Sequence, residues 1–288
     1  MVLQGRGARF TTLGVFLFLA FTLTATADSG VCERRASRGR LEAKVSDPNS
    51  RFSFDNEGGI GGGGVCWWHS RFQRAVWSLA EFHPELPKPT YAEAIKIIDS
   101  LAHVQKVVKI PGYFDFFSFS SDFRKEIQHE LEQWQLRDGF LNQVWIRGIS
   151  GRSNFPRNTR KLGRIMDDLY AYSLRSKIGN FVPWIMIQLK GIESHAALMP
   201  NMRKIPNGYI LDIVESNEPN KTLQWTYHYG DTQMKTGNYD MVPYRGFHRD
   251  AEKMESILSA YCDKTKAKRT TRASFPVEPT PSILNFLP

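Results

Sequence analysis

The sequence lacks the motifs of several large protein classes. No segment has the pattern of a nucleotide or flavin site, and Cys66-x-x-His69 has no second Cys/His pair at the spacing of zinc ligands, so we expect no metal and no cofactor. No internal repeat is present, and beyond residue 23 no apolar run is long enough to cross a bilayer. We therefore expect no integral membrane segment.

Acidic residues are fewer than basic ones. The chain of 288 residues holds 29 Asp and Glu against 38 Lys and Arg, which gives a net charge of +9. Such a balance favours anionic surroundings, for example an anionic surface or cell-wall polymer. It does not predict a specific nucleic-acid partner, because much of the excess lies in charge runs near the two ends.

The first 27 residues have the pattern of a secretory signal peptide. Arg6 and Arg9 precede an apolar run over residues 13–23, and Ala25-Thr26-Ala27 is a small-x-small cleavage site. We expect an extended polar segment over 28–50, one domain over 51–262 and a basic, proline-containing tail over 263–288. The protein is thus predicted to be secreted or periplasmic, and the sequence leaves open whether 28–50 cover the functional site.

Three cysteines are an odd number for an exported protein. Pairing Cys32 with Cys262 would join the two ends of the domain and leave Cys66 as a free thiol. The competing assignment places Cys66 in the disulfide and removes it as a reactive group.

Cys66 follows a glycine-rich loop and begins a predicted helix. Six of the seven residues 58–64 are glycine, which excludes regular structure there. Apolar side chains then recur at helical spacing, at Trp68, Phe72, Ala75, Val76 and Leu79. The unpaired N–H groups at a helix start favour a thiolate, so Cys66 is a candidate nucleophile, although a lone buried cysteine is more often a small core residue.

The remaining pattern predicts an α+β protein. Helices are expected over 66–82, 91–104, 123–136 and 159–173, with a strand or short helix over 140–149 and a helical part spanning about 51–175. Strands are expected over 181–189, near His195, over 209–217 and over 223–229, with a hairpin turn at Asn207-Gly208. We therefore expect an antiparallel sheet in a β-rich part spanning about 176–245.

These features resemble the papain-like cysteine peptidases. Val65-Cys66-Trp67 is similar to their Cys-Trp signature, and His195 lies 129 residues after Cys66, close to the spacing of about 130 in that family. The resemblance implies a papain-like two-lobed fold, in which a helical lobe carries the Cys helix and a sheet lobe carries the His. It also implies that the Cys66 thiolate attacks a carbonyl and that His195 moves the proton.

A third residue would orient the imidazole, and three candidates lie on one predicted strand. Because side chains alternate along a strand, Glu215 and Asn217 share one face and Asp212 points to the other. Val214-Glu215-Ser216-Asn217 resembles the acid-x-Asn segment of bacterial members, which favours Glu215, whereas the plant-type pattern favours Asn217. Both remain candidates.

The chain departs from the family at the oxyanion hole. The family's glutamine lies six residues before the nucleophile, where this chain has Ile60. Asn56 is the substitute we predict, although turn formation is the commoner role of an Asn among glycines, and the backbone N–H of Cys66 would be the second donor.

The resulting expectation is an exported thiol hydrolase, a peptidase acting on peptide or protein substrates. The same dyad would serve a cell-wall amidase or an acyl transferase of the transglutaminase type. The alternative from another class is a non-catalytic peptide-binding or surface-binding protein on the same scaffold, in which the thiol is occupied or misaligned.

Overall fold

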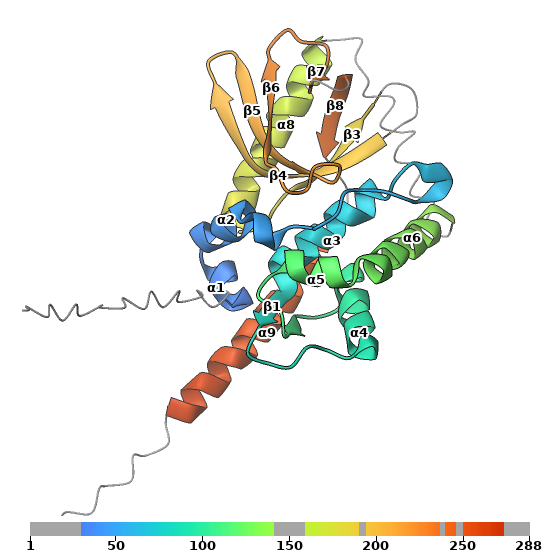
Figure 1. Ribbon diagram of the computed structural model, residues 1–288. Helices are drawn as coiled ribbons and strands as arrows, with labels where there is room; N and C mark the ends of the chain where they lie inside the picture. The colour runs from blue at the N-terminus through green and yellow to red at the C-terminus, as the bar shows by residue number, and fades with distance from the viewer. Residues whose placement is uncertain (1–29, 141–158, 190–193, 237–239, 246–249, 274–288) are drawn as a thin grey trace, which may run out of the picture.

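The chain folds into helices and an antiparallel sheet that pack on the two sides of one central helix, α3 (Figure 1). This computed structural model describes residues 30–140, 159–189, 194–236, 240–245 and 250–273. The described helices longer than one turn are α1 (Val31–Ala36), α2 (Arg38–Ser46), α3 (Cys66–Leu79), α4 (Tyr91–Ala102), α5 (Phe116–Asp122), α6 (Arg124–Phe140), α8 (Thr159–Ile178) and α9 (Asp250–Ala273).

Helix α3 is buried around nearly its whole circumference. Of its fourteen residues only Ser78 is not buried, so the apolar stripe expected from the sequence is present but is not limited to one side. Two polar residues on the remaining surface form hydrogen bonds inside the protein: the Gln73 amide donates to the Ser50 carbonyl at 2.9 Å, and Ser70 Oγ donates to the Ala196 carbonyl at 3.2 Å. The helix therefore joins the helical part to the sheet.

The larger sheet is antiparallel with strand order β6-β5-β4-β3-β8-β7. Its neighbours β4 and β5 form the hairpin predicted at Asn207-Gly208. The strands are β3 (Trp184–Gln188), β4 (Ser194–Ile205), β5 (Gly208–Glu215), β6 (Leu223–His228), β7 (Met234–Lys235) and β8 (Asp240–Arg245); a separate parallel pair is formed by β1 (Ala80–His83) and β2 (Val108–Pro111).

Alternation along the strands divides the core into two clusters. Trp184, Met186 and Val214 pack in the cluster that includes α3, whereas Ile185, Ile187 and their neighbours pack against α8. This alternation follows from the two-residue period of a strand, which sends successive side chains to opposite faces. The sheet is therefore covered by α3 on one face and by α8 on the other.

The two ends of the domain meet at the C-terminal end of α3. A disulfide joins Cys32 in α1 to Cys262 in α9, as the sequence predicts, and Cys66 is free. The buried Arg34 donates from Nε to the carbonyl of Trp77 at 3.1 Å, so α1 also covers the last turn of α3. Because α3 rises about 1.5 Å per residue, this contact lies on the order of 20 Å from Cys66.

The segment preceding the domain differs from expectation. Residues 31–46 form α1 and α2 and are not extended, and apolar contacts explain the difference: Val31, Leu41 and Val45 are buried in the core. Since α1 packs at the far end of α3, this part of 28–50 does not cover Cys66. The signal peptide predicted over 1–27 lies outside the described residues.

Three helix predictions also need correction. The aromatic connector before residue 123 contains α5, which Asp115 caps by accepting from the Ser118 N–H at 2.8 Å, so the predicted helix over 123–136 is the later helix α6. The Cys66 helix ends at Leu79, because the next four residues pair with β2. Finally, α9 continues through residues 263–273, where a tail was predicted. The element predicted over 140–149 falls almost entirely outside the described residues.

No helix in the described ranges is long and apolar enough to cross a membrane.

Candidate active site

Cys66 occupies the first position of α3, as the glycine loop predicts. Five glycines of this loop have positive φ, and at Gly64, where φ is 78°, a Cβ would overlap the amide of Asn56. A side chain at Gly64 would therefore push the loop away from the helix start. The Cys66 side chain is 7% exposed, so the thiol lies in a nearly closed site.

His195 and Glu215 come together because of the register between β4 and β5. Ala197 pairs with Glu215, which places His195, two residues earlier on β4, diagonally across from Glu215 on the same face. Their side chains are 7% and 6% exposed, and Nε2 of His195 lies 3.0 Å from Oε1 of Glu215. At this distance the Glu215 carboxylate forms a close ion pair with the protonated ring.

The other side of the His195 ring contacts Cys66. The two side chains form a hydrogen bond, and since Nε2 faces Glu215, Nδ1 is the nitrogen available to the thiol. Burial disfavours the charged ring and lowers its pKa, but the negative charges of Cys66 and Glu215 favour the imidazolium and outweigh burial. The balance raises the pKa of His195 to about 10.

Glu215 and Asn217 occupy different places in this arrangement. Glu215 contacts the imidazole directly, whereas Asn217 contacts Glu215, donating from Nδ2 to Oε1 of that carboxylate at 3.2 Å. Asp212 lies on the other side of the strand, as alternation predicts, where it accepts from Asn201 at 2.9 Å and from Gln224 at 3.0 Å.

Asn56 lies beside the start of α3, but its side chain is already engaged. Its Oδ1 accepts from the Val65 N–H at 2.5 Å, and its Nδ2 donates to Oδ1 of Asn217 at 3.0 Å. An oxyanion role for Asn56 therefore stays a prediction. The backbone N–H groups of Cys66 and Trp67 make no hydrogen bond within the described part of the chain, as expected for a first helical turn. These two groups are the donors available at the nucleophile.

The glycine loop is held by polar side chains that sequence reasoning missed. Glu132 accepts from the Gly59 N–H at 3.1 Å, and Gln135 both accepts from the Ile60 N–H at 2.9 Å and donates to the Gly64 carbonyl at 3.0 Å. Such residues normally form the solvated face of a helix, so only their spacing on α6, opposite a loop rich in unpaired backbone groups, was available as a signal.

His69, one turn after Cys66, is buried and neutral. It stacks on Phe52 with ring centroids 3.8 Å apart, and its Nε2 lies 3.3 Å from the Phe54 carbonyl, to which it donates. Burial is the main cause that lowers the pKa of His69 to about 3; the hydrogen bond to Phe54 opposes this shift and the charge of His195 adds to it. This environment is that of a core histidine.

One group of side chains in the described residues has the spacing of metal ligands, at Asp99, His103 and Glu130. Both imidazole nitrogens of His103 are already engaged, because Nδ1 lies 3.0 Å from the Asp99 carbonyl and Nε2 lies 2.7 Å from the Arg137 guanidinium. A guanidinium at the remaining nitrogen opposes cation binding, so the group does not fit a metal.

Comparisons with known proteins give no assignment of the fold or of the site. No protein-family model matches the chain, and no curated protein or solved structure matches it significantly.

Proposed function

We propose that this protein is a papain-like thiol hydrolase that cleaves amide bonds, with peptides as its substrate class. The observation that carries the proposal is the buried His195 ring between the Cys66 thiol and the Glu215 carboxylate. A cysteine that only fills the core needs neither the imidazole nor the carboxylate beside it. Burying ionisable groups costs free energy, and such buried groups with shifted pKa values are typical of functional sites. The packing of the sheet on one side of α3 and of the other helices on its opposite side supports the papain-like part of the proposal.

The geometry supports the following reaction. The thiolate of Cys66 attacks the substrate carbonyl carbon, and the backbone N–H groups of Cys66 and Trp67 donate hydrogen bonds to the developing oxyanion. His195 donates its proton to the leaving amine as the C–N bond breaks, which leaves a thioester on Cys66. Water then attacks the thioester and His195 takes a proton from it. The C–S bond breaks, the acid product leaves, and the Cys66 thiolate and protonated His195 are restored.

Glu215 supplies the orientation that this cycle needs. Its carboxylate fixes the ring through Nε2, so that Nδ1 faces the sulfur, and it stabilises the imidazolium. Because the pKa of His195 is raised to about 10, the ring holds its proton for the leaving group throughout the neutral range. The signal-peptide pattern and the Cys32–Cys262 disulfide support action outside the cytoplasm.

The deciding experiment combines thiol alkylation with substrate screening. Iodoacetamide should label Cys66 rapidly near pH 6, well below the ordinary thiol pKa of about 8.5, and His195→Ala should abolish this fast labelling. A peptide library should then be cleaved by the wild type and not by Cys66→Ser. A control variant, His228→Ala, changes an exposed histidine on β6 and should behave as the wild type.

The same experiment separates the alternatives. Product formation only when an amine is supplied as acceptor would indicate acyl transfer in place of hydrolysis. Slow labelling of Cys66 in the folded protein, equal in His195→Ala, would refute the enzyme and leave a binding protein.

A further inference from the structure

A chain of polar contacts connects the two ends of the proposed catalytic pair by a second route. From the helix side, the Val65 N–H donates to Asn56 Oδ1, and Asn56 Nδ2 donates to Asn217 Oδ1. From there Asn217 Nδ2 donates to Glu215 Oε1, which lies 3.0 Å from His195 Nε2. The chain thus runs from the backbone of the glycine loop to the imidazole.

These contacts form a closed ring. Val65 is covalently bonded to Cys66, and Cys66 contacts His195, so the residue at each end of the chain is also a neighbour of the thiol. This ring of contacts crosses the junction between two parts of the fold. The helical part provides Asn56 and Cys66, the sheet provides His195 and Glu215, and the turn after β5 provides Asn217. The Asn56 N–H also donates to the Ser216 carbonyl at 2.7 Å, a backbone bond across the same junction.

The direction of every hydrogen bond in the ring is set by one charge. A carboxylate can only accept hydrogen bonds, so Asn217 must point its Nδ2 toward Glu215, and its Oδ1 then faces Asn56. Asn56 must then present its own Nδ2 to Asn217, which leaves Oδ1 for the Val65 N–H. Turning either amide over would place two donors or two acceptors face to face.

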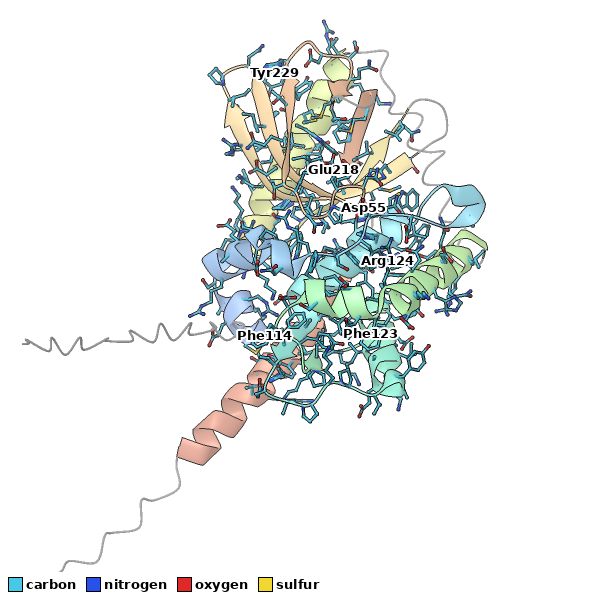
Figure 2. All side chains as sticks on the ribbon, viewed as in Figure 1. Asp55, Phe114, Phe123, Arg124, Glu218 and Tyr229 are labelled. Atoms are coloured by element: carbon cyan, nitrogen blue, oxygen red, sulfur yellow. A yellow bond between two sulfur atoms is a disulfide. The ribbon has the colours of Figure 1, made fainter. Side chains whose placement is uncertain are left out.

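The surroundings are adapted to this contact. Gly64 leaves room for the Asn56 amide, which a Cβ would overlap. Figure 2 labels Asp55 and Glu218, the chain neighbours of Asn56 and Asn217, in the region where the sheet meets the helical part. Glu218 is paired with Lys221 at 2.6 Å, so its charge is compensated close by and does not compete for the amides.

From this geometry we propose that Asn56 and Asn217 are positioning residues, which hold the Glu215 carboxylate and the start of α3 at a fixed separation so that the His195 ring fits between them. The inference rests on the proposed function and gives Asn56 a structural task at the site in place of oxyanion binding. Each amide acts through Glu215 or through Val65, and neither touches the reacting atoms.

The test compares Asn56→Ala, Asn217→Ala and the double variant with Asn220→Ala. Asn220 is exposed in the turn after Asn217, and no hydrogen bond of its side chain is found within the described residues, so it controls for losing an asparagine in this turn. Three quantities are measured: kcat and KM on a cleaved peptide, the pH profile of cleavage, and the pH titration of the His195 imidazole by NMR.

Each single variant should lower kcat about tenfold with little change in KM, because one hydrogen bond to a charged group or to its support is lost. The alkaline limb of the profile and the His195 titration should both move to lower pH. The kcat of the double variant should be no lower than that of the more affected single variant. The reason is that losing either amide already interrupts the closed ring of hydrogen bonds, so losing the second adds nothing.

Two results would overturn the proposal: an unchanged His195 titration in both single variants, or losses of kcat that multiply in the double variant. The NMR titration does not need a substrate. If no peptide is cleaved but the titration shifts as stated, the ring stands and the hydrolase proposal fails; if peptides are cleaved and the titration is unchanged, only the ring fails.

Discussion

Glu215 is one of the two residues whose negative charge favours the protonated form of His195 in the proposed site. We expect Glu215→Gln to keep the side-chain shape and to lower kcat about a hundredfold, because the imidazolium loses one of its two counter-charges. The raised pKa of His195, about 10, means that wild-type activity falls only above that pH, as the ring loses the proton it must donate. In Glu215→Gln this alkaline limb should move down by about one to three pH units.

Asp212→Asn is the matched control for this prediction. It makes the same chemical change three residues away on β5, but on the side that contacts Asn201 and Gln224. A pH profile of cleavage for both variants checks the expectation, which is wrong if the two profiles coincide.

His69 makes a separate prediction about stability. Its pKa is about 3 in the fold and about 6.5 in an unfolded chain, so between these values the unfolded state binds one proton more. The free energy of unfolding should therefore decrease as pH falls below about 6.5, by up to about 1.4 kcal/mol per pH unit from this residue. At higher pH His69 is neutral in both states, so it causes no such decrease in the free energy of unfolding.

Urea denaturation at pH 7 and pH 5 measures this dependence. His69→Leu should unfold more easily at both values, because its bond to Phe54 is lost, but it should show a smaller difference between them. His228→Leu, at an exposed position, should keep the wild-type difference. Equal pH dependence in the wild type and His69→Leu would show that His69 is not neutral in the fold.

The sequence carries some of the site residues and not their contacts. A glycine loop and a helix start suffice to single out Cys66, because local pattern fixes where a helix begins. His195 is selected by the spacing that the papain-like resemblance implies. Strand alternation suffices to separate Glu215 from Asp212. It does not separate Glu215 from Asn217, since both lie on one face and the contact depends on the register of β4 against β5. The catalytic roles stay predictions.

Among the elements, α3 depends on buried charges that tie it to α6 and α9. Arg71 contacts Asp138 at 2.9 Å and Asp250 at 2.6 Å, and Arg74 lies 3.4 Å from Asp250. Burial lowers the pKa of Arg74, which the Asp250 charge partly opposes. Removing this carboxylate leaves two buried guanidinium groups with too little negative charge.

Asp250→Ala is therefore expected to lower the free energy of unfolding by about 3 kcal/mol. Glu255→Ala removes an acid from the same helix, but its partner Arg35 and the acid itself are partly exposed, so its cost should stay below about 1 kcal/mol. Denaturant titration of both variants tests the contrast. Similar midpoints would mean that the buried cluster adds no net stability.

Helix and strand prediction succeeded where local signals are strong. Thr90 and Glu93 form the capping box that starts α4, and the bond from the Glu93 N–H to Thr90 is present. It failed for α1 and α2, whose polar sequence hides three buried apolar residues. Those helices depend on packing against the rest of the fold, which a short sequence window does not reveal.

For the whole molecule, the disulfide closes a loop of 230 residues between α1 and α9. Dithiothreitol should lower the free energy of unfolding by about 3–5 kcal/mol, because the unfolded chain regains freedom. Fast alkylation of Cys66 at 25 °C should survive, since the disulfide lies at the opposite end of α3. Thermal unfolding with and without reductant checks the loss of stability, and iodoacetamide labelling of the reduced protein checks the reactivity of Cys66.

The double variant Cys32→Ser/Cys262→Ser provides the control. It should unfold at the lower temperature with or without reductant, and Cys66 should still react rapidly with iodoacetamide after the reductant is removed. A loss of that reactivity would mean that the disulfide and the site are coupled through α3.

The order in which the site residues occur along the chain has a consequence for biosynthesis. Cys66 is made 129 residues before His195 and 149 residues before Glu215, and the register that aligns the last two requires both strands of the β4–β5 hairpin. If Cys66 is the nucleophile we propose, its sulfur is activated only when the sheet is complete. We therefore expect the growing chain to be inert while it is being made.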